Sequence, residues 1–271
     1  MAHWTEELFI DNPELFQSNF DARAEHVSGE VDFLLEKLKE HGFQSGRILD
    51  LNCGIGRHSV ELGKRGQEVV GTDISPQYIV AAGKKAEEAG VKDRTTFKVV
   101  DMREIASKLS AEKPFDGIIC MWTAFGYYDD DTNDDILRQC VRLIKPGGFF
   151  ALDIINRDWL LSAFADSGYH TVGDMIVLEE RQFDVRTSRN ASKWVFLRTL
   201  DETNYKSLKT VTIEHRIWSL HELVSLYERA GLEHVATYAG FGPGFHPQQK
   251  PIESLRELMP SRMLLCIGRK Q

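Results

Sequence analysis

The stretch ILDLNCGIGRH, residues 48–58, places an aspartate, a cysteine and two glycines between an apolar run and a segment with helical spacing. Glycines let a ligand come close to the backbone, and the first turn of the following helix offers N–H groups without intrahelical partners. A glycine-rich turn directly after a strand therefore predicts a nucleotide-like cofactor. Several cofactors use such a turn, so the choice between them depends on the rest of the chain.

Outward from this stretch, short apolar strands alternate with helical segments along residues 47–155. Repeated strand–helix units predict a parallel sheet that is covered by helices on both faces. Residues 1–45 space their apolar side chains three and four apart, which indicates helices. Ser75 before Pro76 and Ser219 before Glu222 are typical of helix starts.

The strand–helix rhythm breaks after residue 167. Residues 168–217 contain three extended segments, MIVLEERQFDV, KWVFLRTL and SLKTVTIEHRIW, separated by the turn-like sequences TSRNAS and DETNYKS. A helix and two strands follow. The pattern predicts an α/β sheet with an antiparallel insert, divided into an N-terminal helical cap (1–45), a cofactor-binding domain (46–167 and 218–271) and an acceptor lid (168–217).

Composition excludes several classes of protein. The net charge of the 271 residues is −8 and the basic residues are dispersed, so a nucleic-acid partner is disfavoured. No apolar run approaches the roughly 18–20 residues of a membrane helix, and the N-terminus lacks signal-peptide features, so we expect a cytoplasmic protein without a membrane partner. The four cysteines are scattered without a Cys-x-x-Cys pair, which argues against a metal site or disulfides.

Four segments in order, LDLNCGIG, VVGTDIS, FKVVDM and FDGIICMW, resemble the motifs of class I S-adenosylmethionine-dependent methyltransferases. LIKPGGFFALD resembles the segment that leads into strand five of that family. The resemblance covers residues 47–155 and resumes over 219–268. It implies a Rossmann-like, doubly wound, seven-stranded and mostly parallel sheet with S-adenosyl-L-methionine as cofactor, and it places the antiparallel insert between strand five and the next helix.

The resemblance also implies roles for single residues. Gly54 and Gly56 would let the loop pass the methionyl part of the cofactor, and Asp50 would hold that loop or the cofactor's amino group. Asp73 would accept hydrogen bonds from the ribose hydroxyls and Asp101 one from the adenine amino group. The alternative is that these aspartates only cap strand ends or the next helix. The full set of predicted cofactor-binding residues is Asp50, Asn52, Cys53, Gly54, Gly56, Asp73, Ile74, Asp101, Met102, Arg103 and Met121.

The stretch after strand four, MWTAFGYYDDD, bears on the methyl acceptor. It lacks the Asn/Asp-Pro-Pro-Tyr/Phe signature of enzymes that methylate nucleic-acid amines. It resembles instead the S-x-G-Y stretch of a small-molecule subgroup that includes amino-sugar N,N-dimethyltransferases. That subgroup also carries a β insert, followed by an Arg-x-aromatic motif similar to HRIW. The predicted acceptor-binding residues are Trp122, Phe125, Tyr127, Tyr128, Arg157 and Arg216, although the aromatic ones could equally pack the insert against the sheet.

Methyl transfer from a sulfonium depends mainly on alignment and desolvation of the nucleophile, so no catalytic residue is assigned. The candidates for positioning are Tyr127, His215 and Arg216. On a strand over 210–218, His215 shares a face with apolar residues and could be a core histidine. Arg216 shares the polar face and could clamp an anionic part of the acceptor or pair with Glu214.

The sequence thus predicts an S-adenosylmethionine-dependent methyltransferase acting on a small-molecule acceptor, with N-methylation ahead of O-methylation. Methylation of RNA remains an alternative. So do a NAD-dependent oxidoreductase, which Asp50, Asp101 and Ser59 disfavour, and a cofactor-binding protein without catalysis. Whether the protein is a monomer or a homodimer stays open.

Overall fold

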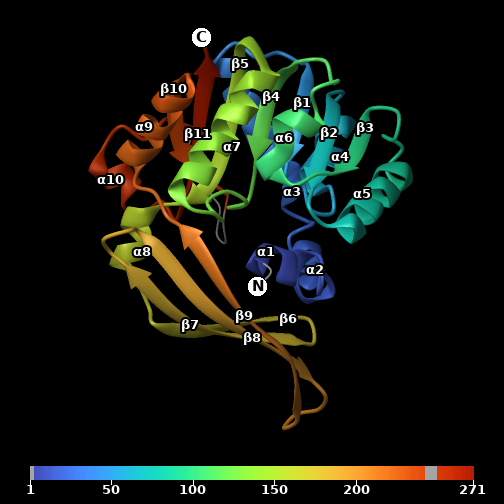
Figure 1. The fold of residues 1–271 in the computed structure, drawn as a ribbon, viewed down its shortest axis with the longest axis vertical. Coiled ribbons are helices and arrows are strands. Elements are labelled where there is room, and N and C mark those ends of the chain that lie inside the picture. Colours follow the sequence, from blue (N-terminus) through green and yellow to red (C-terminus); the bar gives the residue numbers. More distant parts are fainter. Residues whose placement is uncertain (1–2, 242–248) are drawn as a thin grey trace.

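The computed structural model describes residues 3–241 and 249–271, and its main element is a seven-stranded sheet (Figure 1). The strand order is β10-β11-β5-β4-β1-β2-β3, in which β11 runs antiparallel to both of its neighbours and the other pairs are parallel. The predicted fold class, a Rossmann-like and mostly parallel α/β sheet, is confirmed. The strands are β1 (Arg47–Leu51), β2 (Glu68–Asp73), β3 (Thr95–Val99), β4 (Phe115–Cys120), β5 (Ile144–Ile155), β10 (Leu232–Ala239) and β11 (Met263–Lys270).

Helices cover both faces of this sheet because each face carries its own apolar core. On one face Ile105, Ile136 and Leu223, from α6, α7 and α9, pack against the strands. On the other face Leu34 of α3 and Leu62 of α4 do the same. The helices of the sheet region are α3 (Val27–Glu40), α4 (Arg57–Lys64), α5 (Pro76–Glu88), η1 (Met102–Glu104), α6 (Ile105–Lys108), α7 (Asp130–Leu143), α8 (Arg157–Ser162), α9 (Leu220–Ala230) and α10 (Leu255–Leu258).

The start signals predicted for two of these helices are present. The Ser75 side chain accepts a hydrogen bond from the backbone N–H of Tyr78 at the start of α5, where Pro76 occupies the first turn. Ser219 and Glu222 form a capping box at the start of α9.

A second, antiparallel sheet of four strands leaves the first sheet after β5 and returns before α9. Its strands are β6 (Ser167–Val172), β7 (Met175–Asp184), β8 (Arg189–Thr199) and β9 (Tyr205–Arg216), in this order across the sheet. The sequence predicted three of the four. The strand SGYHTV was missed because glycine and polar residues lower its strand signal, and TSRNAS was read as a turn although β8 begins within it. The division of the chain into cap, domain and lid stays a prediction.

The N-terminal helices α1 (Trp4–Phe9) and α2 (Glu14–Asp21) lie between the two sheets (Figure 1). Leu8 and Leu15 pack on the antiparallel sheet, against residues that include Phe196 and Val211. Phe20 packs on the other side, against Ile55 and Tyr78 of the first sheet's loops and helices. These two helices therefore close the space beyond the carboxyl ends of β1, β2 and β4.

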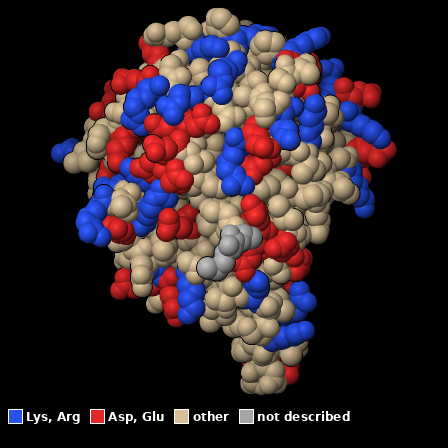
Figure 2. All heavy atoms as spheres, in the orientation of Figure 1, with Lys and Arg blue, Asp and Glu red and all other residues tan. Residues whose placement is uncertain are grey.

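Charged side chains of both signs lie on the surface that Figure 2 shows. Acidic and basic side chains are interspersed on the face that Figure 2 shows, without a continuous basic stripe. Within residues 3–241 and 249–271, none of the helices combines the length and the apolar character that crossing a bilayer requires.

Candidate functional site

The glycine loop between β1 and α4 needs its glycines for two separate reasons. Gly54 and Gly56 have φ values of +54° and +75°, in the left-handed region that other residues rarely adopt. A Cβ at Gly56 would lie 2.8 Å from Cβ of Ala82 in α5, and one at Gly54 would lie 3.0 Å from the ring of Phe20. The loop therefore packs closely on α5 and beneath the N-terminal cap.

Asp50 holds the base of this loop. Its Oδ2 accepts a hydrogen bond of 2.6 Å from the Ser59 hydroxyl in the first turns of α4. This contact explains why Ser59 stands where the dinucleotide-binding pattern has its third glycine. Complete burial raises the pKa of Asp50, so the carboxyl is a strongly desolvated group at the end of β1.

Asp73, at the end of β2, ties the loop to the neighbouring strand. One of its oxygens accepts from the Gly54 backbone N–H and the other from the Ser75 backbone N–H, both at 2.9 Å. Burial raises the pKa of Asp73 to about 6, although these hydrogen bonds oppose the shift. A carboxylate has further lone pairs, so Asp73 can accept additional hydrogen bonds from a ligand.

Asp101, after β3, does cap the next helix, because it accepts a 2.8 Å hydrogen bond from the Arg103 backbone N–H. It also pairs with the Arg103 guanidinium, which stacks over the Tyr128 ring at 4.8 Å. Burial would raise the pKa of Asp101, but the contacts with Arg103 outweigh it and the pKa is lowered. Asp101 is thus an ionised acceptor at the cavity described next.

A cavity of about 720 Å³ opens between the two sheets and the N-terminal helices. It is lined by most residues of the predicted cofactor and acceptor sets: Asp50, Asn52, Cys53, Gly54, Asp73, Ile74, Asp101, Met102, Met121, Trp122, Tyr127, Tyr128 and His215. Five predicted site residues are absent from the lining: Gly56, Arg103, Phe125, Arg157 and Arg216. Glycine loop, strand ends and insert therefore face one common space.

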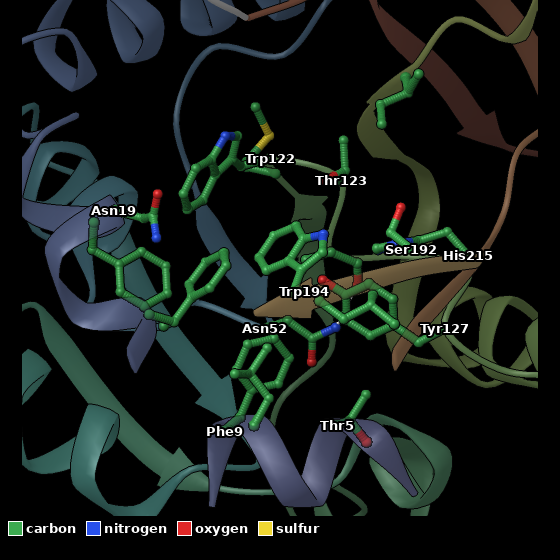
Figure 3. Close-up of a pocket in the computed structure, with 18 of the residues that line it drawn as sticks. Thr5, Phe9, Asn19, Asn52, Trp122, Thr123, Tyr127, Ser192, Trp194 and His215 are labelled. Atoms are coloured by element: carbon green, nitrogen blue, oxygen red, sulfur yellow. Dashed lines mark hydrogen bonds between the residues drawn. The ribbon is translucent and has the colours of Figure 1, made fainter. Parts of the chain in front are cut away.

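The sequence missed most of the aromatic wall of this cavity. Phe9 of the N-terminal helices lines it together with Trp122 and Trp194 (Figure 3). Phe16 and Phe20 of α2 also belong to the lining. The rings of Phe16 and Trp194 are stacked with centroids 6.0 Å apart, and Phe16 and Phe20 each lie within 5.6 Å of Trp122. The concentration of aromatic residues in HWTEELFIDNPELFQSNF was the available signal.

Asp153 of β5 is a second residue that sequence reasoning missed. Its side chain accepts hydrogen bonds from the backbone N–H groups of Trp122, at 3.1 Å, and Phe241, at 2.9 Å. Trp122 and Thr123 have φ values of +56° and +57°, so Asp153 stabilises a strained turn directly at the cavity. Burial raises the pKa of Asp153 to about 8.

His215 lies at the cavity rather than in a closed core. Its ring centroid is 5.0 Å from that of Tyr127 and 5.5 Å from that of Trp4 (Figure 3). Burial lowers the pKa of His215 to about 4, so the imidazole is neutral near pH 7. None of the described residues forms a hydrogen bond with the ring, which leaves it able to bind a ligand.

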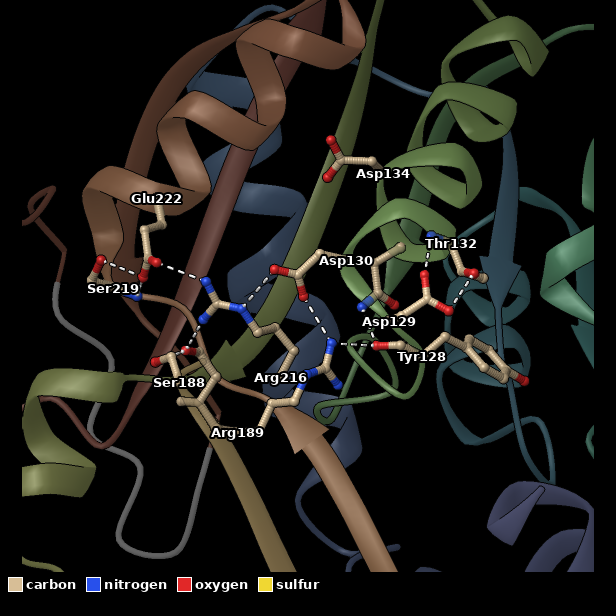
Figure 4. Close-up of polar contacts among 12 residues, drawn as sticks. Tyr128, Asp129, Asp130, Thr132, Asp134, Ser188, Arg189, Arg216, Ser219 and Glu222 are labelled. Carbon is tan, nitrogen blue, oxygen red and sulfur yellow. Dashed lines mark hydrogen bonds and ion pairs between the residues drawn. The ribbon is translucent and has the colours of Figure 1, made fainter. Parts of the chain in front are cut away.

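Arg216 is held elsewhere, in a polar network that joins three elements (Figure 4). Its guanidinium donates to Glu222 at 2.7 Å and to the Ile217 carbonyl at 2.6 Å, and it lies 3.5 Å from Asp130. Arg216 does not line the cavity, so the predicted contact between Arg216 and an anionic acceptor there is not supported. The prediction put Arg216 on the strand face shared with polar residues, but the strand ends there and the side chain is buried beside Glu222 of α9 and Asp130 of α7.

Two other predicted acceptor contacts also lie outside the cavity. Arg157 donates to the Ser188 hydroxyl at 2.6 Å, which fixes α8 to the start of β8. Phe125 stacks on Trp218 in the core of the first sheet, with centroids 5.5 Å apart. Phe125 is therefore a packing residue, which was the stated alternative to a contact with the acceptor.

Comparison with known proteins finds similarity to methyltransferases. Residues 48–148 match a family model described as a methyltransferase domain. The chain is similar to a ubiquinone biosynthesis O-methyltransferase of Psychrobacter cryohalolentis, at 28% identity over 45% of this chain and 46% of that protein. It is also similar to a glycine/sarcosine N-methyltransferase of Parasynechococcus marenigrum, at 32% identity over 59% of this chain and 54% of that protein. The chain thus spans about half the length of the curated relatives it matches.

Among solved structures, one similar chain is an S-adenosylmethionine-bound amino pentose methyltransferase from Micromonospora echinaspora. The TM-score is 0.66 at 15% identity, and the match covers 94% of this chain and 96% of that one. At this identity the likeness shows the fold. The chain has the fold of class I methyltransferases, and residues 48–148 are similar to a methyltransferase domain.

Proposed function

We propose that the protein is an S-adenosylmethionine-dependent methyltransferase that moves a methyl group to a small-molecule acceptor. The observation that carries the proposal is the cavity of about 720 Å³, which is lined by the glycine loop and the strand-end carboxyl groups and also by a wall of aromatic side chains. A cofactor at the loop and an acceptor at the wall would share this space. The open side of the parallel sheet is also where ligands bind in α/β folds.

The residues present fit this cofactor. Asp73 and Asp101 line the cavity at successive strand ends, where they can accept hydrogen bonds from hydroxyl and amino groups. Gly54 offers bare backbone beside them. When bound, S-adenosylmethionine would supply an electrophilic methyl group on its sulfonium.

The chain's own contribution is to orient the acceptor and exclude water. The rings of Trp4, Phe9, Phe16 and Trp194 enclose the cavity from the side of the cap and the insert. An amine acceptor needs only to arrive deprotonated, and desolvation between aromatic rings favours its neutral form. The neutral His215 imidazole can accept a hydrogen bond from the acceptor's N–H or O–H and is a positioning residue in this proposal.

We place N-methylation ahead of O-methylation, because an amine needs no general base whereas a hydroxyl does. The glycine/sarcosine and amino pentose enzymes among the similar proteins support this order, and the ubiquinone biosynthesis O-methyltransferase supports the alternative. The mass spectrum of a methylated product, compared with N- and O-methyl standards, separates the two.

Calorimetry with S-adenosylhomocysteine and with NAD tests the cofactor assignment. We expect binding of S-adenosylhomocysteine and none of NAD, since the ribose-facing Asp73 is accompanied by Asp101 and a serine in place of the third glycine. Turnover on a panel of amines and phenols then tests catalysis. Binding of NAD alone would favour an oxidoreductase, and cofactor binding without turnover on any acceptor would favour a non-catalytic protein.

A further inference from the structure

Three arginines face the cavity without an anionic partner. Arg23, Arg57 and Arg262 all belong to its lining, and none of them forms a side-chain hydrogen bond or ion pair with a described residue. The guanidinium groups of Arg23 and Arg57 lie 4.6 Å and 4.9 Å from the centre of the Trp122 ring, and that of Arg262 lies 5.1 Å from the centre of the Trp159 ring. Most other arginines of the described chain are paired, as Arg216 and Arg103 illustrate.

Such a cluster is unfavourable without a ligand. Burial lowers the pKa of Arg23; the charges of Glu30 and Asp153 oppose this shift, and the charge of Arg262 adds to it. Burial likewise lowers the pKa of Arg57, which is 9% exposed and has one terminal nitrogen buried without any partner. An anion between these groups would remove both the repulsion and the unsatisfied donors.

The neutral donors of the cavity point to the same kind of ligand. Besides Arg57, three lining residues carry buried N–H groups without partners: Trp4, Asn19 and Trp194. The unsatisfied acceptors among the described lining residues are fewer: the side-chain oxygen of Asn190 and one nitrogen of the neutral His215 ring. Donors therefore outnumber acceptors at this wall, which suits a ligand whose polar atoms only accept hydrogen bonds.

The acidic residues nearby act on the cluster without forming an ion pair with it. The charge of Glu30 favours the charged forms of Arg23 and Arg57, but its carboxylate is hydrogen-bonded to His58 at 3.0 Å and contacts neither arginine directly. Asp153 is held in its neutral form near pH 7, because burial raises its pKa to about 8. Glu179, farther along the wall, pairs with Arg181 and His170.

The three unpaired arginines outnumber the carboxylates of the cofactor. S-Adenosylmethionine has one carboxylate, and Arg57 is placed to meet it, since it directly follows the glycine loop and lines the cavity. Arg23 and Arg262 remain. We propose that the methyl acceptor carries a carboxylate, which Arg23 and Arg262 bind beside Trp122 and Trp159. This inference rests on the proposed function and narrows its substrate class to small anionic molecules with an apolar or aromatic body.

The experiment compares matched probes on protein saturated with S-adenosylhomocysteine. The probes are phenylacetate with phenylacetamide, 4-aminobenzoate with 4-aminobenzamide, and indole-3-acetate with indole-3-acetamide, followed by calorimetry or ligand-observed NMR. We expect at least one carboxylate to bind at least tenfold more tightly than its amide. The double variant Arg23→Met and Arg262→Met should abolish this preference and keep the affinity for S-adenosylhomocysteine within about twofold.

Arg229→Met, on the exposed surface of α9, is the matched control and should keep the carboxylate preference. Circular dichroism verifies that each variant folds. The single variant Arg23→Lys should keep part of the carboxylate preference that the double variant loses, because lysine retains the positive charge. The inference is overturned if no carboxylate is preferred, or if the preference survives in the double variant.

A second titration separates the two possible carboxylates, with 5′-methylthioadenosine as a cofactor fragment that lacks one. If the double variant binds S-adenosylhomocysteine tenfold more weakly but 5′-methylthioadenosine normally, Arg23 and Arg262 serve the cofactor, which contradicts the inference alone. Failure of the wild-type protein to bind S-adenosylhomocysteine contradicts the proposed function, and this inference with it.

Discussion

Asp73 and Asp153 are both buried carboxyl groups near strand ends, but their neighbours give them different tasks. Asp73 faces the cavity and holds the glycine loop through the Gly54 N–H, whereas Asp153 lies behind the strained turn at Trp122. Replacing Asp73 is therefore expected to affect ligand binding, whereas replacing Asp153 is expected to change the pH dependence of stability.

Replacing Asp73 should weaken cofactor binding. Asp73→Asn loses the charge-assisted contacts that a carboxylate can make to ribose hydroxyls, and we expect a loss of roughly 1.5–3 kcal/mol, about ten- to a hundredfold in Kd. Calorimetry with S-adenosylhomocysteine measures it. Asp116→Asn is the matched control, because Asp116 also accepts a backbone N–H but lies at the opposite end of the sheet. Unchanged affinity in a folded Asp73→Asn protein would remove Asp73 from the site.

Asp153 should make the protein less stable as the pH rises. Its pKa is raised from the usual value of 3.8 to about 8, so between these values the folded state holds a proton that the unfolded state releases. The contribution of this group to the free energy of unfolding is complete below about pH 4 and is lost towards pH 8, with a slope of at most about 1.4 kcal/mol per pH unit.

Urea denaturation of the wild type and of Asp153→Asn at pH 5, 6, 7 and 8 tests this. The variant loses one acceptor for a backbone N–H but has no titration, so the wild-type advantage should shrink as the pH rises. A difference that is the same at every pH would show that Asp153 is ionised throughout.

At the scale of elements, the network around Arg216 joins the end of β9 to α9 and to the start of α7. Glu222 accepts from Arg216 and also from the Ser219 backbone N–H, so one carboxylate serves both the helix cap and the ion pair. These contacts lower the pKa of Glu222 to about 2, although burial opposes the shift. The network therefore fixes the point at which the antiparallel sheet returns to the first sheet.

A double-mutant cycle with Arg216→Met and Glu222→Gln should give a coupling energy of roughly 1–3 kcal/mol at pH 7. Because the pKa of Glu222 is lowered from 4.5, this stabilisation is present above about pH 4.5 and is lost as the pH falls towards 2. The coupling at pH 3 should accordingly be smaller than at pH 7. Affinity for S-adenosylhomocysteine should stay within about twofold in Arg216→Met, and a larger loss would mean that the network shapes the cavity.

At the scale of the whole molecule, two sheets and the helices between them enclose one cavity, while the outer surface is acidic overall and mixed in charge. The arginines without partners face inward. Binding to an extended polyanion needs a concentration of cations on an accessible surface, and here Arg23, Arg57 and Arg262 instead line a cavity of about 720 Å³.

We therefore expect only weak binding to RNA. Fluorescence anisotropy with labelled tRNA in 150 mM KCl should give a dissociation constant weaker than about 1 μM, in the range of non-specific electrostatic binding. A submicromolar, salt-sensitive affinity would contradict the small-molecule proposal and favour RNA modification.

The sequence by itself determined the parallel sheet, the glycine loop and the strand-end aspartates. These features depend on residues that are close along the chain: apolar runs form strands, and Gly54 and Gly56 adopt positive φ because they lack a Cβ. For the same reason the starts of α5 and α9 were predictable. The strand β6 was not, because its residues become a strand only when β7 pairs with them.

Only the tertiary structure decided which side chains face the cavity. The sequence selected Arg216, which forms a network with Glu222, whereas Arg23 and Arg262 lie 239 positions apart and line the same cavity. Arg23 lies just after α2 and Arg262 directly precedes β11. Their position at one cavity therefore depends on how α2 packs between the two sheets and on where β11 enters the first sheet. Long-range packing sets both, and no local pattern of residue types encodes it.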